Sequence, residues 1–194
     1  MGEILFRTRL SENLFKGLSP WMQKLPGGLI HVNVVGCALF AAISGSSAAT
    51  VATVGKMSIP ELRKRNYPEK ILLGSLAGSG TLGLLIPPSI ILIIYGVAVQ
   101  ESIAKLFIAG ILPGIMVALI FMSYVIFWSL INKKQMPKII EEYSIFEKIK
   151  RSKQLLPVIF LISAVIGSIY TGIATATEAA SLGVVGALIL SYFQ

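Results

Sequence analysis

Residues 40–50 read FAAISGSSAAT, and this stretch decides the fold. It lies inside a block of 31 residues, 25–55, that contains no Asp, Glu, Lys or Arg. Its centre, Ser44 to Ser47, places hydroxyl-bearing and glycine residues in succession between two apolar halves. Irregular backbone at membrane depth is tolerated only where protein buries it or a wet cavity solvates it. The pattern therefore predicts two half-helices that meet at a polar tip, in a re-entrant helical hairpin over residues 28–56.

The composition of the chain places this hairpin in a membrane. Of the 194 residues, 55% are apolar and 13% are charged, and the mean hydropathy is +0.80. A soluble domain usually has about a quarter of its residues charged. The apolar content excludes a disordered or nucleic-acid-binding chain despite a pI near 9.7, and the single Cys37 excludes a disulfide framework. We expect an all-α, polytopic membrane protein that contacts the lipid bilayer and binds no nucleic acid.

Three further uncharged blocks are each long enough to cross a bilayer, which takes about 20 residues. They are 71–100, 106–132 and 154–177. If block 25–55 crossed once, twelve basic residues would lie on one side and five on the other. If it returned to the side of entry, sixteen would share one side and Lys105 alone would lie opposite. Short basic loops stay cytoplasmic, so both arrangements are biased but the hairpin fits better. The composition of the block favours it further, and we expect the basic loops to be cytoplasmic.

The remaining segments complete the expected architecture. Residues 1–27 predict an amphipathic interfacial or scaffold helix, because four leucines and Trp21 share one helical face. We expect transmembrane helices with a Pro-Pro break over 57–132, a basic cytoplasmic linker helix over 133–153, and further transmembrane helices over 154–194. The final run is apolar with no flanking charge, which predicts that the chain is an internal piece of a longer membrane protein.

The expected tip has the chemistry of an ion and anion site. The incoming half-helix would end near Ser44 and leave its last carbonyls without partners. The outgoing half-helix would start near Ser46 or Ser47, which are good N-cap residues, and leave free N–H groups. Carbonyls and hydroxyls suit Na⁺, whereas a positive helix N-terminus suits a carboxylate. The alternative is that these small residues only permit tight helix packing.

A second polar interruption lies at residues 80–89, GTLGLLIPPS. Pro87 and Pro88 have no N–H groups, so the carbonyls of Gly83 and Leu84 lose their helical partners. These carbonyls and the hydroxyls of Thr81 and Ser89 predict a cation cradle near mid-membrane. The alternative is a proline kink whose freed groups bond to neighbouring helices.

Three smaller patterns have structural interpretations. Pro113 with Gly110 and Gly114 predicts a kink in the block 106–132. Thr175 and Glu178 have the spacing of a capping box, which we favour over a functional intramembrane acid. The lone His31 is expected to be a satisfied interfacial residue rather than a proton carrier.

Four stretches in order carry a resemblance to a known family. They are residues 40–50, residues 80–96 with IPPS at 86–89, KLFIAGILPG at 105–114, and ATEAA at 176–180. Together they resemble the large membrane subunit, of DctM type, of tripartite ATP-independent periplasmic (TRAP) transporters. The resemblance covers nearly the whole chain. Family members are about twice as long and contain two inverted repeats, so this chain would supply the first repeat only.

The resemblance implies a Na⁺-coupled, elevator-type secondary transporter of bacterial inner membranes, with no enzymatic activity and no cofactor. It implies a small membrane subunit and a periplasmic solute-binding protein as partners, and small organic acids such as dicarboxylates or sialic acids as solutes. The expected Na⁺-binding residues come from the tip and the break: Ser44, Gly45, Ser46, Ser47, Gly83, Ile86, Pro87 and Pro88. The expected substrate-binding residues bear hydroxyls: Ser46, Ser47, Thr50, Thr81 and Ser89.

Two other functions are compatible with a polar re-entrant loop. A passive channel also uses such loops as a selectivity filter, but it would conduct without saturating and would need no soluble binding protein. A non-transporting scaffold would be indifferent to substitutions at both interruptions. An intramembrane enzyme has little support, because the chain has no Asp, one His and one Cys.

The expected topology is testable by thiol labelling. If the hairpin returns to its side of entry, cysteines placed at positions 16 and 58 will react with an impermeant reagent from the same side of the membrane. Labelling from opposite sides would refute the hairpin.

Overall fold

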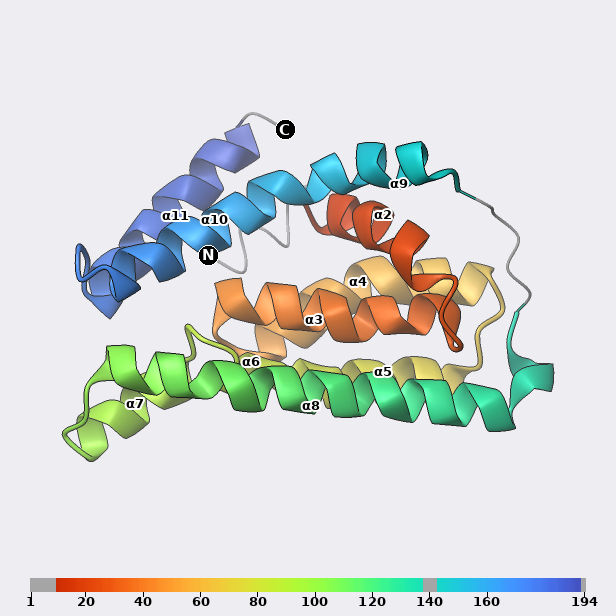
Figure 1. The fold of residues 1–194 in the computed structure, drawn as a ribbon, viewed down its shortest axis with the longest axis horizontal. Helices are drawn as coiled ribbons and strands as arrows, with labels where there is room; N and C mark the ends of the chain where they lie inside the picture. The colour runs from red at the N-terminus through yellow and green to blue at the C-terminus, as the bar shows by residue number, and fades with distance from the viewer. Residues whose placement is uncertain (1–9, 138–142, 193–194) are drawn as a thin grey trace.

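A computed structural model describes residues 10–137 and 143–192, and its regular structure in these ranges is entirely helical (Figure 1). Three helical stretches are long and apolar enough to cross a membrane: Glu69–Ala98, Ile103–Ile131 and Ile145–Tyr170. Many of their large apolar side chains are exposed, including Leu112 at 76% and Phe160 at 74%. Soluble monomers rarely expose apolar surface on this scale. The fold is therefore that of a polytopic, all-helical membrane protein.

The expected hairpin forms as two antiparallel helices that pack side by side (Figure 1). Helix α3 (His31–Ser44) is apolar around most of its circumference and ends at the expected residue. Helix α4 (Ser47–Lys64) starts after two residues and runs eight residues beyond the expected boundary at 56. It buries Val54 and Leu62 and ends in Arg63 and Lys64. Cations in a last helical turn interact favourably with the helix dipole.

The second interruption also forms where the sequence predicts it. Helix α5 (Glu69–Gly80) is followed by one turn of helix, α6 (Leu82–Leu85), and the chain is then irregular until α7 (Ile90–Ala98). Ile86 takes an extended conformation, as expected for a residue before proline. Helix α8 (Ile103–Ile131) returns along the whole of α5–α7 without a break (Figure 1).

Buried hydrogen bonds join the hairpin to α5. The Asn33 amide Nδ2 donates to the Leu72 carbonyl at 3.1 Å and to Ser75 Oγ at 3.0 Å. One turn further on, the Ser79 hydroxyl donates to the Asn33 carbonyl at 3.4 Å. Asn33 and Ser79 are fully buried. We refer to Asn33, Ser75 and Ser79 as the polar seam.

The N-terminal segment does not lie only at an interface. Helix α2 (Leu10–Met22) inserts Leu14 and Leu18 into the main apolar core, where they are almost fully buried, and leaves Trp21 46% exposed. The amphipathic face predicted from the sequence is therefore largely a core contact with the hairpin and α10 (Leu156–Tyr170).

The segment predicted as a linker helix over 133–153 is not one helix. It starts with a 3₁₀ turn, η2 (Lys133–Gln135), and the only α-helix in its described part is α9 (Ile145–Ser152). A 3₁₀ turn, η3 (Lys153–Leu155), joins α9 to α10, and residues 138–142 lie outside the described ranges. The last helix, α11 (Ala176–Tyr192), begins with the predicted capping box: Glu178 Oε2 accepts from the Thr175 N–H at 2.8 Å.

The helix ends place the basic segments together. The end of α4, the start of α5, the end of α8 and all of α9 lie at one end of the molecule, on the right of Figure 1, and the α7–α8 turn lies at the other. Lys105 is in the first turn of α8, next to that turn. Both open ends of the hairpin are therefore on the basic side.

This geometry refines the labelling test. Ser58 is fully buried, so position 58 is unsuitable, whereas the Lys64 side chain is 73% exposed. Cysteines replacing Lys16 and Lys64 are expected to react with an impermeant thiol reagent from the same side, and a cysteine replacing Lys105 from the opposite side. The native Cys37 is buried and should add little background. Reaction of the Lys64 variant from the Lys105 side would contradict this arrangement.

Candidate functional site

The hairpin tip and the Pro-Pro break are in direct contact. The Ile90 N–H, the first of α7, donates to the Gly45 carbonyl at 3.3 Å. On the other side of the tip, a Cβ on Gly83 would lie 2.8 Å from Ser46 C and from Ser47 N. Gly83 therefore allows the break to approach the tip backbone more closely than a side chain would permit. The structure thus joins two interruptions that are far apart in the sequence into one site.

Gly45 is required by the shape of the tip. It has a φ of +60°, in the left-handed region, and its N–H donates to the Ala41 carbonyl at 3.0 Å to close the end of α3. A Cβ at this position would lie 2.7 Å from the Pro88 carbonyl oxygen. The Pro88 carbonyl therefore lies against the tip.

The tip hydroxyls form a closed hydrogen-bond circuit. The Ser46 N–H donates to Ser44 Oγ at 3.4 Å, Ser44 Oγ and Thr50 Oγ1 are 2.8 Å apart, and Thr50 Oγ1 donates to the Ser46 carbonyl at 2.7 Å. Each hydroxyl oxygen can both donate one proton and accept, so the circuit leaves lone pairs for a further ligand. Thr50 is fully buried within it. Ser46 is the N-cap residue of α4, but its side chain makes no capping hydrogen bond.

The break holds itself together with one of the residues expected to bind solute. The Ser89 hydroxyl is fully buried and donates to the Leu84 carbonyl at 2.6 Å, while the Ile86 N–H donates to the Leu82 carbonyl at 2.8 Å. Of the two carbonyls expected to be free, that of Leu84 is therefore satisfied. Pro87 and Pro88, joined by a cis peptide bond, bring the chain from this braced turn to the start of α7.

Two glycines of α8 form the wall behind the break. A Cβ on Gly110 would lie 3.1 Å from the Leu85 carbonyl oxygen, and one on Gly114 would lie 2.9 Å from Ile86 Cγ1. Helix α8 is continuous through Pro113, so the predicted interruption is absent and the glycines serve close packing instead. Their spacing of four residues was the signal for this role, since small residues one turn apart mark close helix contacts in membranes.

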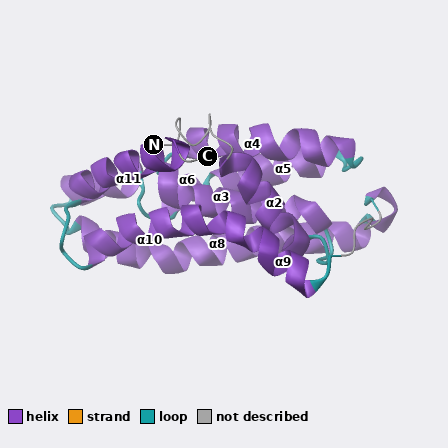
Figure 2. Ribbon diagram, turned by 90° about the horizontal axis from the view of Figure 1, so that it is seen from above, coloured by secondary structure: helices purple, strands orange, loops and turns teal. Residues whose placement is uncertain are grey.

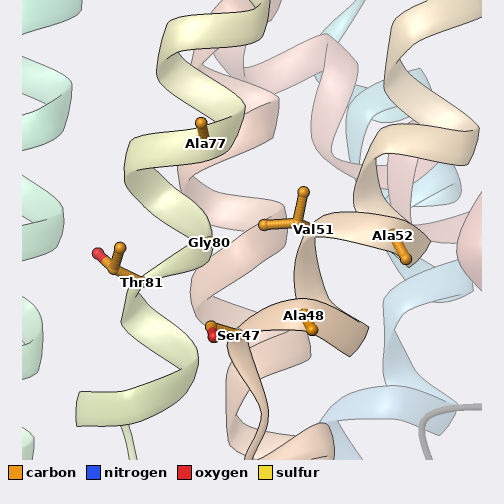
Figure 3. Close-up of a pocket in the computed structure, with 7 residues that line it drawn as sticks. All are labelled: Ser47, Ala48, Val51, Ala52, Ala77, Gly80 and Thr81. Atoms are coloured by element: carbon orange, nitrogen blue, oxygen red, sulfur yellow. The ribbon is translucent and has the colours of Figure 1, made fainter.

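A groove runs from the tip between α4 and α5. It has a volume of about 420 Å³ and is lined mainly by small side chains (Figure 3): Ser47, Ala48, Val51, Ala52, Ala77, Gly80 and Thr81. Ser47 lies at the end of the groove nearest the tip, whereas Thr81 projects from the far side of its helix. The Thr81 hydroxyl donates to the Gly78 carbonyl at 2.7 Å. Of the five expected solute contacts, only Ser47 and Thr81 line this groove.

The donors at this site suit a hard cation. Within the described residues, no three His, Cys, Asp or Glu side chains come together to hold a metal ion. The tip and the break instead offer hydroxyl and carbonyl oxygens, which are ligands for alkali and alkaline-earth ions rather than for zinc or copper. His31 is buried at the opposite end of α3, where Nε2 lies 2.8 Å from the Pro26 carbonyl oxygen, and it does not contribute to the site.

Comparison with known proteins places the chain in one family. Residues 1–194 match the family described as the tripartite ATP-independent periplasmic transporter, DctM component. The chain is 39% identical over 167 residues to the C4-dicarboxylate TRAP transporter large permease of Pseudomonas aeruginosa, covering 86% of this chain and 38% of that protein. It is 33% identical over 188 residues to an ectoine/5-hydroxyectoine large permease of Ruegeria pomeroyi, covering 97% of this chain and 43% of that protein.

A third relative has a different solute in its name. The sialic acid TRAP transporter permease of Haemophilus influenzae is 34% identical over 185 residues, covering 95% of this chain and 29% of that protein. The chain thus spans well under half the length of these relatives. The family is one of transporter permeases and not of enzymes. The match over its full length shows that the chain belongs to the DctM family of TRAP transporter large permeases.

Proposed function

We propose that this chain is the first repeat of a Na⁺-coupled, elevator-type permease that imports small organic anions across a bacterial inner membrane. The observation that carries the proposal is the contact between the hairpin tip and the Pro-Pro break, through Ile90 N–H and the Gly45 carbonyl. Interrupted helices that meet near mid-membrane are a common way for secondary transporters to build ion and substrate sites. A second, inverted repeat and the partner subunits would complete the machine.

The hairpin is re-entrant in this proposal. Helix α3 has 14 residues, which corresponds to a length of about 21 Å and is short of the roughly 30 Å of a hydrocarbon core. Its tip contacts residues 83–90, inside the span Glu69–Ala98 rather than at either end of it. Both observations support a hairpin that enters from the basic side and returns to it. That side would be cytoplasmic.

We assign the coupling ion to the junction itself. The tip would contribute oxygens from Ser44 to Ser47, and the break would contribute carbonyls around Gly83 and from Ile86 to Pro88. The Pro88 carbonyl already lies against Gly45, and the Ser44 hydroxyl retains acceptor capacity within the tip circuit. A Na⁺ ion held by both sides would fasten the tip to the break and so fix the start of α4.

The solute would bind at the start of α4, where the first N–H groups of an 18-residue helix are directed at the tip. A helix N-terminus favours an anionic group, so a carboxylate is the expected partner of Ser46 and Ser47. Dicarboxylates and sialic acids, the solutes of two relatives, both carry one. Of the other expected contacts, Thr81 would border the groove, whereas Thr50 and Ser89 would act indirectly by shaping the tip and the break.

The partners follow from the tripartite family. We propose that a small membrane subunit packs against the permease and that a periplasmic solute-binding protein delivers the anion. Ion binding at the junction would precede solute binding, because the Na⁺ charge and the fixed α4 N-terminus both attract the carboxylate. No other cofactor is required in this scheme.

Substitution at the tip is expected to weaken Na⁺ dependence. In the full-length permease with its partners, Ser46→Ala or Pro88→Ala should raise the Na⁺ concentration for half-maximal uptake into proteoliposomes about tenfold, since losing one hydrogen bond or ligand to a charged group costs about 1.5 kcal/mol. Ser168→Ala is the matched control, because that hydroxyl donates only to the Val165 carbonyl of its own helix, at 2.8 Å. Unchanged Na⁺ dependence in both test variants would refute the ion site.

The close approach at Gly83 gives a second test. Gly83→Ala should lower the thermal unfolding temperature of the purified full-length permease and reduce uptake, because the new Cβ overpacks the tip backbone and such overpacking costs about 1–3 kcal/mol. Gly74→Ala on α5 is the control, since a Cβ there meets no atom within 4 Å. Wild-type unfolding temperature and uptake in the Gly83 variant would show that the tip and the break do not need this contact.

A further inference from the structure

Helix α9 exposes an apolar face that the fold leaves uncovered. Ile145 is 74% exposed, Phe146 is 77% exposed and Ile149 is 53% exposed. Their spacing of three and four residues puts them on one face of the helix. The helix lies at the basic end of the molecule, where it continues through a 3₁₀ turn into the apolar helix α10 (Figures 1 and 2).

Basic side chains flank this face. Lys148, Lys150, Arg151 and Lys153 follow one another within six residues. Glu147, the acidic residue of α9, accepts from the Ser144 N–H at 3.0 Å in a capping box, so its charge sits at the helix start. The segment 144–153 therefore carries a net charge of +3 beside an exposed apolar face.

The surface is held in place by a tryptophan of α2. Trp21 Nε1 donates to Ser152 Oγ at 2.8 Å, and the Lys148 ammonium lies 5.5 Å from the centre of the indole ring. Close packing of Gly17 against the Leu155 side chain holds the next turn. Tryptophan is enriched at membrane–water interfaces, where one part of the ring is apolar and another is polar.

We propose that α9 is a binding surface for anionic phospholipid headgroups at the basic end of the protein. Lys148, Lys150 and Arg151 would contact the lipid phosphates, while Phe146 and Ile149 would insert beside the acyl chains. Charge complementarity favours this occupant: basic residues next to apolar ones at the end of a membrane helix attract anionic lipids, whereas a soluble protein or nucleic acid would leave the apolar face in water. The inference is independent of the proposed Na⁺ site and of transport.

The test uses Trp21 as a reporter in the full-length permease. The protein is reconstituted in phosphatidylcholine vesicles that contain the same mole fraction of either brominated phosphatidylglycerol or brominated phosphatidylcholine. Trp21 emission is taken as the difference between the wild type and Trp21→Phe. We expect brominated phosphatidylglycerol to quench this emission on the order of twofold more than brominated phosphatidylcholine, because the anionic lipid is enriched at α9.

Two charge variants decide the origin of the preference. The double variant Lys150→Gln, Arg151→Gln should remove the difference between the two lipids, and its unfolding temperature should match the wild type because both side chains lie outside the core. The matched variant Lys133→Gln, Lys134→Gln, at the end of α8, should keep the difference. Equal quenching by both lipids in the wild type, absence of quenching by either, or equal loss in both double variants would each overturn the proposal.

Discussion

The structure depends on two interrupted helices that satisfy each other's backbone. The end of α3 leaves carbonyls without helical partners and the start of α7 leaves N–H groups without them, and the hydrogen bond from Ile90 N–H to the Gly45 carbonyl pairs one of each. Unpaired backbone groups are costly in an apolar medium. Gly45 and Gly83 allow the pairing on the hairpin side, and Gly110 and Gly114 allow it on the α8 side, because all four lack a Cβ that would keep the elements apart.

The same pairing gathers helix ends of opposite polarity. Helix α3 ends at the junction with its partially negative carbonyls, while α4 and α7 begin there with their partially positive N–H groups. A site built in this way can attract a cation and an anion to neighbouring positions without any charged side chain. This explains how a chain with no Asp, and with no cluster of acidic or metal-binding side chains in its described residues, can still provide an ion site.

Sequence reasoning found the features that depend on local chemistry. The tip at Ser44 to Ser46, the break at Pro87 and Pro88 and the capping box at Thr175 are each specified by a few adjacent residues, and all three are confirmed. Whether the tip and the break bind Na⁺ stays a prediction.

The features that sequence reasoning missed depend on which elements meet. The hydroxyls of Thr50 and Ser89 were expected to face a solute, but each finds a backbone carbonyl within its own turn. The two α8 glycines suggested a kink because their partner, Ile86, lies in another element. The 133–153 segment has strong helical periodicity only from residue 145 on, where Ser144 and Glu147 cap the helix. The polar seam determines what the hairpin can do as a moving part. Sliding α3 along α5 would separate the Asn33 amide from the Leu72 carbonyl and from Ser75, and buried groups left unpaired cost about 1–3 kcal/mol each. The hairpin is therefore not a flap that opens and closes over a site. It is locked to the first half of the broken helix, so any large displacement of the tip must carry α5 with it as one rigid piece.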